Sequence, residues 1–185
     1  NKSTSVANNV KFNENITFVT INPFSYPEPS TSIIWWISPT RKILSEINNL
    51  LQEVNENISQ SKTNIHQPDT SQKDEGIYHQ TIVLGHYPSR MWFPSFSSTL
   101  SSSNNNVRIY LCGHRHPTKP RILHHGQAIE VVGTPLFRYN EVGILSSDNG
   151  HFSYHQVNLN SEKFAFLTYP NPDSMKSSME RFDEP

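Results

Sequence analysis

Short apolar runs separated by longer polar stretches mark the strands that this sequence predicts. Residues 16–21 read Ile-Thr-Phe-Val-Thr-Ile, and two further runs, at residues 81–84 and 107–112, each end just before a Gly-His pair. β-Branched and aromatic residues of this kind fit a pleated, buried surface. The three runs therefore predict buried strands, the last two of which lead into tight loops.

A helical pattern lies between the first two runs. Its apolar residues recur three or four positions apart and leave one polar face. They are Ile43, Leu44, Ile47, Leu50, Leu51, Val54 and Ile58. Ser38 is a good N-cap and Pro39 suits the first helical position, so the helix is expected to begin there and to pack on the sheet.

The second half of the chain predicts antiparallel strands. Residues 141–146 and 151–159 flank Asp-Asn-Gly at 148–150, which is a signal for a hairpin turn. Three more apolar runs predict short strands, at residues 122–123, 128–132 and 164–167. Together with the helix, these runs predict an α/β fold with a mixed sheet and a C-terminal antiparallel hairpin.

Polar segments divide the chain into a folded body and its extensions. They predict a polar tail at residues 1–14, insertions at about 57–79 and 95–106, and a disordered polar tail at 170–185. Residues 15–169 would then form the folded body. With 185 residues and a hydrophobic content of 34%, the chain is long enough for one core diluted by polar loops.

The composition limits the classes of partner and structure. The formal net charge is −1, and no basic patch typical of nucleic-acid binding is visible. Cys112 is the only cysteine, so no disulfide can form within the chain, and its apolar neighbours indicate a small buried side chain rather than a reactive thiol. The longest strongly apolar stretch, residues 33–37, is too short to cross a bilayer.

Three histidines follow the strands that end in Gly-His. They are His86 after the first of these strands and His114 and His116 after the second. In an extended chain His114 and His116 point to the same side, and the glycines before His86 and His114 let the backbone turn closely around an ion. Neutral imidazole is a common ligand of zinc, iron and manganese-like ions. Three imidazoles at one sheet edge therefore predict part of a metal site; the alternative is ordinary strand-end and loop histidines.

Other histidines are expected to have no special role. His124 and His125 separate two of the short predicted strands, and as adjacent residues they would face opposite sides of a strand. His151 and His155 lie in the predicted hairpin. All four are expected to be ordinary surface residues; the alternative for His124 or His125 is a place lining the cleft.

The segments Gly85-His86-Tyr87-Pro88 and Gly113-His114-Arg115-His116 together resemble the calcineurin-like metallophosphoesterases, which carry Gly-His-x-Pro and Gly-His-x-His loops in this order. The likeness is greatest to the group of this family that contains transmembrane protein 62. That group has an Asn-x-Thr-Phe strand, matched here by residues 15–18, and a Leu-Cys-Gly-His-x-His loop, matched by residues 111–116. The resemblance covers roughly residues 15–170.

The resemblance implies a four-layer α/β/β/α sandwich and a site for two divalent metal ions of the zinc, iron or manganese class. In that site His86 and His114 would bind one ion and His116 the other. Two such ions neutralise a phosphoester substrate and activate a bridging water. The implied reaction is phosphoester hydrolysis without a covalent enzyme intermediate.

Three other motifs of the family are absent from this sequence, namely Asp-x-His, Gly-Asp-x-x-Asp and Gly-Asn-His. In the family they supply the bridging carboxylate, an asparagine ligand and an assisting histidine, and all lie upstream. The chain is therefore expected to be the C-terminal half of a catalytic domain, with its catalytic residues upstream, and to be inactive alone.

Two other functions stay open. One is a non-catalytic scaffold or interaction module of a membrane-associated protein, and the other is a single-ion histidine site of structural purpose. Members of the resembling group carry transmembrane helices after the catalytic domain, which implies a membrane-associated parent for a segment that is itself expected to be soluble. Sequons at Asn1, Asn15 and Asn57 favour a lumenal or extracellular face.

Overall fold

The structure is a computed structural model, and it describes residues 7–11, 16–22, 41–63, 79–92, 94–148, 150–170 and 172–176. The helices are α1 (Arg41–Thr63), α2 (Pro94–Ser101) and α3 (Leu136–Tyr139), with 3-10 turns η2 (Ser89–Met91), η3 (Ser103–Asn105) and η4 (Asp173–Met175). The strands are β1 (Ala7–Lys11), β2 (Ile16–Ile21), β3 (Gln80–Leu84), β4 (Val107–Cys112), β5 (Arg121–His125), β6 (Ala128–Val132), β7 (Glu141–Asp148) and β8 (His151–Asn158).

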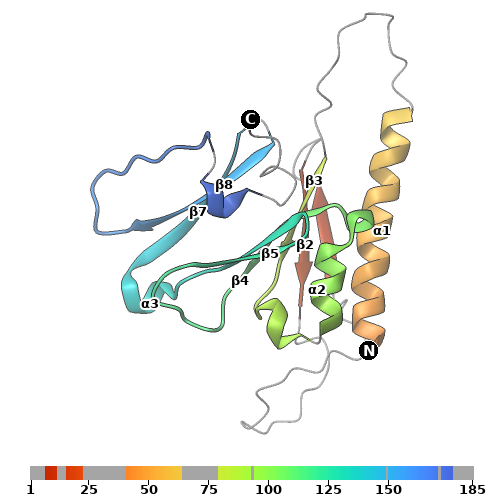
Figure 1. Ribbon diagram of the computed structural model, residues 1–185, viewed down its shortest axis with the longest axis horizontal. Coiled ribbons are helices and arrows are strands. Elements are labelled where there is room, and N and C mark those ends of the chain that lie inside the picture. The colour runs from red at the N-terminus through yellow and green to blue at the C-terminus, as the bar shows by residue number, and fades with distance from the viewer. Residues whose placement is uncertain are drawn as a thin grey trace, which may run out of the picture.

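Six strands form a mixed sheet in the order β1-β2-β3-β4-β6-β5 (Figure 1). β2, β3, β4 and β6 are parallel, and the edge strands β1 and β5 run antiparallel to their neighbours. α1 connects β2 to β3 and α2 connects β3 to β4, because parallel neighbours need a crossover. The carboxyl ends of β3, β4 and β6 therefore meet at one edge of the sheet, which we call the carboxyl edge.

The larger core lies between the sheet and the helices. Side chains alternate along a strand, so that Val19, Val83 and Tyr110 belong to this core while their neighbours face the other way. The helices contribute Ile47, Leu51 and Val54 from α1 and Phe96 and Leu100 from α2. All of these side chains are buried, which explains why the helices stay on this face.

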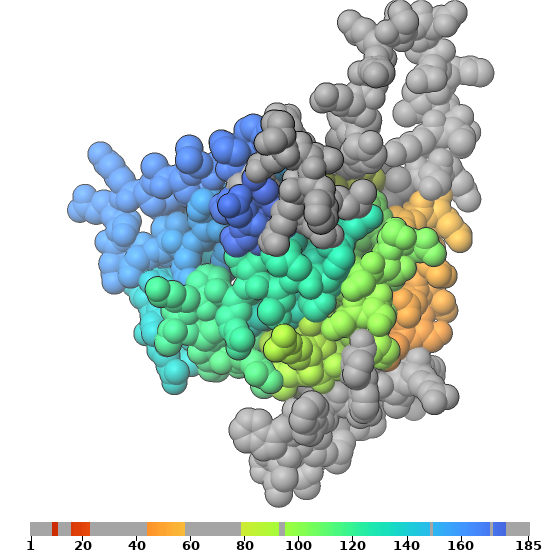
Figure 2. All heavy atoms as spheres, viewed as in Figure 1, coloured from red at the N-terminus to blue at the C-terminus, as the bar shows by residue number. Residues whose placement is uncertain are grey.

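The opposite face of the sheet is covered by the β7–β8 hairpin. Ile82, Ile109 and Val131 pack there with Phe152 of β8 and with Met175 of η4. The described residues thus form three layers, with the helices on one side of the sheet and the hairpin on the other (Figures 1 and 2). The α/β class, the mixed sheet and the antiparallel hairpin are confirmed, whereas a four-layer sandwich is not seen among the described residues.

Two predicted polar segments are partly structured. The tail predicted at residues 1–14 contains β1, in which Val10 lies opposite Phe18 of β2. The insertion predicted at 57–79 begins too early, because α1 continues to Thr63. Both segments are polar in sequence, but an edge strand and the outer turns of a helix need only backbone hydrogen bonds and one packed face.

The insertion predicted at 95–106 is instead a helix and a turn that belong to the core. Phe96 and Leu100 are fully buried on α2, and they stand one helical turn apart among serines that face outward. Two apolar residues four positions apart are enough to attach a short helix to a sheet. The serine-rich composition of this segment concealed them.

Other predicted boundaries also differ. β5 includes His124 and His125, and the turn that follows is at Gly126, whose φ is +59°. Residues 164–167 form no strand, and the tail predicted from residue 170 contains η4, where Met175 is 1% exposed. The predicted helix start at residues 38–39 and the apolar stretch at 33–37 lie outside the described residues.

Candidate functional site

The two Gly-His loops leave β3 and β4 side by side at the carboxyl edge. The amide of Gly85 donates to the carbonyl of Leu111 at 2.9 Å, and the amide of Gly113 donates to the carbonyl of His86 at 3.0 Å. These two bonds continue the pairing of β3 with β4 past the ends of the strands. Each loop therefore holds the other at the point where the histidines begin.

His86 and His114 lie in contact. His114 Nδ1 is 3.2 Å from His86 Nε2, and the two ring centroids are 5.1 Å apart. The ring of Tyr87 supports both histidines, with centroids 4.7 Å from His86 and 4.6 Å from His114. Tyr87 is buried and both histidines are exposed, so the two imidazole rings pack on the tyrosine ring and are accessible to solvent.

The spacing of the two nitrogens fits a shared metal ion. Two imidazole nitrogens on one tetrahedral zinc ion stand about 3.4 Å apart, given bonds of about 2.0–2.1 Å. The observed 3.2 Å also suits a hydrogen bond in which one neutral ring donates to the other. The pair can thus provide two ligands of a four-coordinate site.

His116 does not join the other two. Its ring packs against Phe137 of α3, with centroids 5.3 Å apart. The expectation that His114 and His116 share a side rested on an extended backbone, but β4 ends at Cys112 and the two histidines have φ values of +65° and +46°. Within the described part of the chain, no three His, Cys, Asp or Glu side chains are grouped so that they could hold a metal ion.

The surroundings of His114 favour its neutral form. Partial burial lowers the pKa of His114, and the charges of His86, His116 and Arg115 lower it further. A neutral imidazole is the form that binds a metal ion.

The two glycines have different roles. A Cβ on Gly85 would lie 2.5 Å from the hydroxyl of Tyr110, so only glycine leaves room for that ring. A Cβ on Gly113 would have no neighbour within 4 Å. The sequence suggested that both glycines allow a close turn around an ion. At Gly85 the structure gives a different reason, the packing of Tyr110, and at Gly113 no neighbouring atom requires a glycine.

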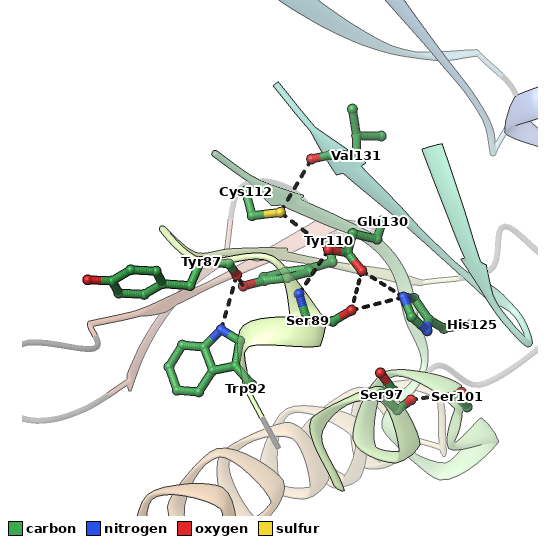
Figure 3. Close-up of polar contacts among 10 residues, drawn as sticks. All are labelled: Tyr87, Ser89, Trp92, Ser97, Ser101, Tyr110, Cys112, His125, Glu130 and Val131. Atoms are coloured by element: carbon green, nitrogen blue, oxygen red, sulfur yellow. Dashed lines mark hydrogen bonds and ion pairs between the residues drawn. The ribbon is translucent and has the colours of Figure 1, made fainter. Parts of the chain in front are cut away.

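Buried aromatic side chains hold the first Gly-His loop from the helix side. The carbonyl of Tyr87 accepts hydrogen bonds from Trp92 Nε1, at 3.0 Å, and from the hydroxyl of Tyr110 (Figure 3). Phe96 fills the space between those two rings, 5.3 Å from each by centroid. The polar ends of Trp92 and Tyr110 are thus satisfied inside the core by the backbone of the loop.

A buried carboxylate holds the end of the same loop. Glu130 is fully buried on β6, and its Oε1 accepts a hydrogen bond from the backbone amide of Ser89 at 2.9 Å. Its Oε2 accepts one from the Ser89 hydroxyl and lies 2.7 Å from His125 Nε2 (Figure 3). Burial by itself raises the pKa of Glu130, but the hydrogen bonds from His125 and Ser89 outweigh it and lower the pKa overall.

Sequence reasoning missed this group of residues. It placed His125 on the surface, whereas only 13% of its side chain is exposed. The available signal was Glu130 itself, an acidic residue in the middle of the apolar run Ala-Ile-Glu-Val-Val. Acidic residues are almost never fully buried unless they are paired.

Cys112 is the small buried side chain that the sequence predicts. Burial raises the pKa of its thiol far above the ordinary range, and the charge of Glu130 and a hydrogen bond to that carboxylate raise it further. The sulfur lies 3.5 Å from Glu130 Oε1 and 3.7 Å from the carbonyl of Val131. A thiol held in this way is not a nucleophile or a metal ligand.

The sequence was compared with protein-family models and with curated proteins. No protein-family model matches the chain, and a search of curated proteins finds no match. Among the described residues, no helix combines the length and apolar character that a membrane span needs. Of the three sequons, Asn57 lies exposed on α1, and Asn1 and Asn15 are outside the described residues.

Proposed function

We propose that this chain is the C-terminal part of a metal-dependent phosphoesterase, in which His86 and His114 bind one divalent ion and His116 binds a second. The observation that carries the proposal is the 3.2 Å contact between His86 Nε2 and His114 Nδ1 at the carboxyl edge. Ligands of open α/β sheets bind at such an edge, outside the carboxyl ends of the strands. The order of the two Gly-His loops supports the same function.

The residues of this chain would hold and orient the ions. His86 and His114 offer ring nitrogens that stand on the ring of Tyr87, and His116 follows His114 two positions later on the same loop. Two bound ions would supply charge neutralisation and an activated water for in-line attack on phosphorus. The bridging carboxylate and the remaining ligands would come from polypeptide outside this sequence.

Basic side chains at the carboxyl edge suit an anionic substrate. Several exposed Arg and Lys residues lie on segments that begin or end at this edge, and none of them forms an ion pair within the described part of the chain. They are Arg90, Arg115, Lys119, Arg121 and Arg138. Positive side chains near this edge would attract the opposite charge, here the phosphate group of the ester.

The coding sequence on the 5′ side of the codon for Asn1 provides the first test. The proposal requires Asp-x-His, Gly-Asp-x-x-Asp and Gly-Asn-His segments there, and reading the coding sequence on the 5′ side of Asn1 checks for them. A coding sequence that lacks these motifs on the 5′ side of Asn1 would contradict the proposal.

The activity of the intact polypeptide is the second test. With Mn²⁺ it should hydrolyse p-nitrophenyl phosphate, and H86A or H114A should lower kcat/KM by at least about 100-fold, because even outer-shell partners of metal ligands contribute about 10–100-fold. H124A is the matched control, since His124 is an exposed histidine at the far end of β5. Equal losses in H124A and H114A would contradict the assigned ligands.

A non-catalytic interaction module is the second candidate function. Two exposed apolar side chains near the carboxyl edge support this candidate, Leu136 with 54% and Phe137 with 75% of its surface exposed. Clustered apolar side chains on a surface mark binding sites. An intact polypeptide that lacks the upstream motifs, and in which F137A abolishes binding of a partner, would favour this function over hydrolysis.

A further inference from the structure

Glu130 binds the end of the loop that carries His86. That loop runs from Gly85 to Ser89, and its first part is tied to the β4 loop by the bonds Gly85 N–H to Leu111 and Gly113 N–H to His86. Its last residue, Ser89, is tied to β6, because its amide donates to Glu130 Oε1 at 2.9 Å. His86 lies between these two attachments, next to Tyr87, whose carbonyl accepts hydrogen bonds from Trp92 and Tyr110.

We infer that Glu130 is a positioning residue for His86: its carboxylate holds the Ser89 end of the loop and so keeps His86 against His114. This inference rests on the proposed function in so far as the pair binds a metal ion. It also stands on geometry alone, since five residues fixed at both ends leave the histidine little room to move. Nothing in the Gly-His-Tyr-Pro segment itself indicates a role for β6.

A carboxylate is the side chain that this place requires. The buried charge of Glu130 is compensated by four donors: the amide and hydroxyl of Ser89, the ring of His125 and, more weakly at 3.5 Å, the thiol of Cys112. An apolar residue would leave the Ser89 amide buried without an acceptor, and the loop would then have to move to reach water. A glutamine can accept at one atom only and presents an NH₂ group to the other donors.

The same atoms do not form a nucleophile triad. His125 uses one nitrogen, Nε2, toward both Glu130 Oε2 at 2.7 Å and Ser89 Oγ at 3.3 Å. A serine triad needs the histidine between its two partners, with a different nitrogen toward each. Ser89 is also fully buried and out of reach of a substrate. The role of the group is therefore to fix the loop, and His125 extends the attachment to the edge strand β5.

Ser89 offers a matched pair of variants. S89A keeps the backbone amide that donates to Glu130, and S89P removes that amide. Proline is tolerated at the first residue of a helical turn, and Pro88, with ψ of 148°, is already in the conformation that a following proline demands. E130Q tests the hydrogen bond between the Ser89 amide and Glu130 by changing the carboxylate that accepts it.

Two measurements on the whole chain test the inference. The first is the nuclear Overhauser effect between the rings of His86 and His114 without metal, and the second is the dissociation constant for Co²⁺, with H114A as the baseline. Wild type and S89A should show the ring contact and equal Co²⁺ affinity. E130Q and S89P should lose the contact and bind Co²⁺ about 10-fold more weakly, as expected for outer-shell partners. Nuclear Overhauser effects between the paired strands β7 and β8 show whether each variant is folded.

The outcomes separate the inference from the proposed function. If wild type binds Co²⁺ no better than H114A, the metal site fails, and the ring contact still tests the role of Glu130. If E130Q and S89P keep both the contact and the affinity, the inference is overturned. If E130Q does not fold, S89P decides between these results, since it leaves the carboxylate in place.

Discussion

At the scale of single residues, identical motifs have different physical reasons. Gly85 and Gly113 each precede a histidine at the end of a strand, yet only Gly85 is required by its surroundings, because the hydroxyl of Tyr110 occupies the space of a Cβ. The sequence could not reveal this difference, since Tyr110 reaches Gly85 from a neighbouring strand. Three substitutions at this scale, G85A, G113A and E130Q, test the packing and the buried charge.

Alanine at the two glycines should therefore have unequal effects on stability. G85A forces the buried Tyr110 ring to shift and should lower the free energy of unfolding by about 1–3 kcal/mol. G113A meets no atom within 4 Å and should change it by less than about 0.5 kcal/mol. Urea denaturation of both variants measures the difference, and equal losses would show that the steric reason is wrong.

The lowered pKa of Glu130 predicts a pH-dependent contribution to stability. The folded chain binds the proton of Glu130 less tightly than the unfolded chain, in which glutamate titrates near about pH 4.3. The contribution is thus fully present above that pH and is lost as the pH falls through the folded-state pKa. E130Q should cost about 1–3 kcal/mol at pH 7, since it mispairs buried donors.

That cost should shrink as the solution is acidified. Urea denaturation of wild type and E130Q at pH 7, 5 and 3.5 measures it, and the two unfolding free energies should approach each other at the lowest pH. A difference that stays constant over this range would show that the charge of Glu130 contributes nothing and that only its shape matters.

At the scale of elements, the strongest apolar patterns were predicted correctly. The run at 16–21 is β2, the runs before the Gly-His pairs are β3 and β4, and the turn at 148–150 joins β7 to β8. α2 was missed because four of its eight residues are serine, so its apolar positions are few. Helix propensity is weak there, and the helix depends on burial of Phe96 and Leu100.

α2 should consequently behave as part of the core and not as an insertion. F96A removes a fully buried ring that lies between Trp92 and Tyr110, and it should destabilise the chain by about 3–5 kcal/mol. S98A on the exposed side of the same helix should change stability by less than about 0.5 kcal/mol. Thermal or urea unfolding measures both changes. If F96A left the free energy of unfolding nearly unchanged, α2 would not be part of the core.

At the scale of the whole molecule, topology brings the candidate chemistry together. Parallel β3, β4 and β6 place both Gly-His loops and α3 at the carboxyl edge, while the hairpin and the helices cover the two faces of the sheet. The arrangement assembles two histidines in contact and leaves the third against Phe137. No three His, Cys, Asp or Glu side chains are grouped among the described residues, so this part of the chain brings together at most two ligands of the proposed metal site.

The chain by itself should accordingly show no phosphoesterase activity. Hydrolysis of p-nitrophenyl phosphate with Mn²⁺ or Zn²⁺ should proceed at the same background rate for wild type and H114A, because no three metal-ligating side chains are grouped among the described residues. Turnover by the wild-type chain that is lost in H114A would show that the site is complete without further polypeptide.

The sequence alone determined the elements whose signal is local. β2, β3, β4, the hairpin and most of α1 follow from the periodicity of contiguous residues, and the two Gly-His loops follow from where β3 and β4 end. Only the tertiary structure decided that His86 meets His114 while His116 turns away, because the left-handed backbone at His114 and His116 ends the alternation of an extended strand. It alone also joined Glu130 to Ser89, 41 residues apart in the chain. Such a contact depends on strand order and register, which no local pattern of hydrophobic and polar residues records.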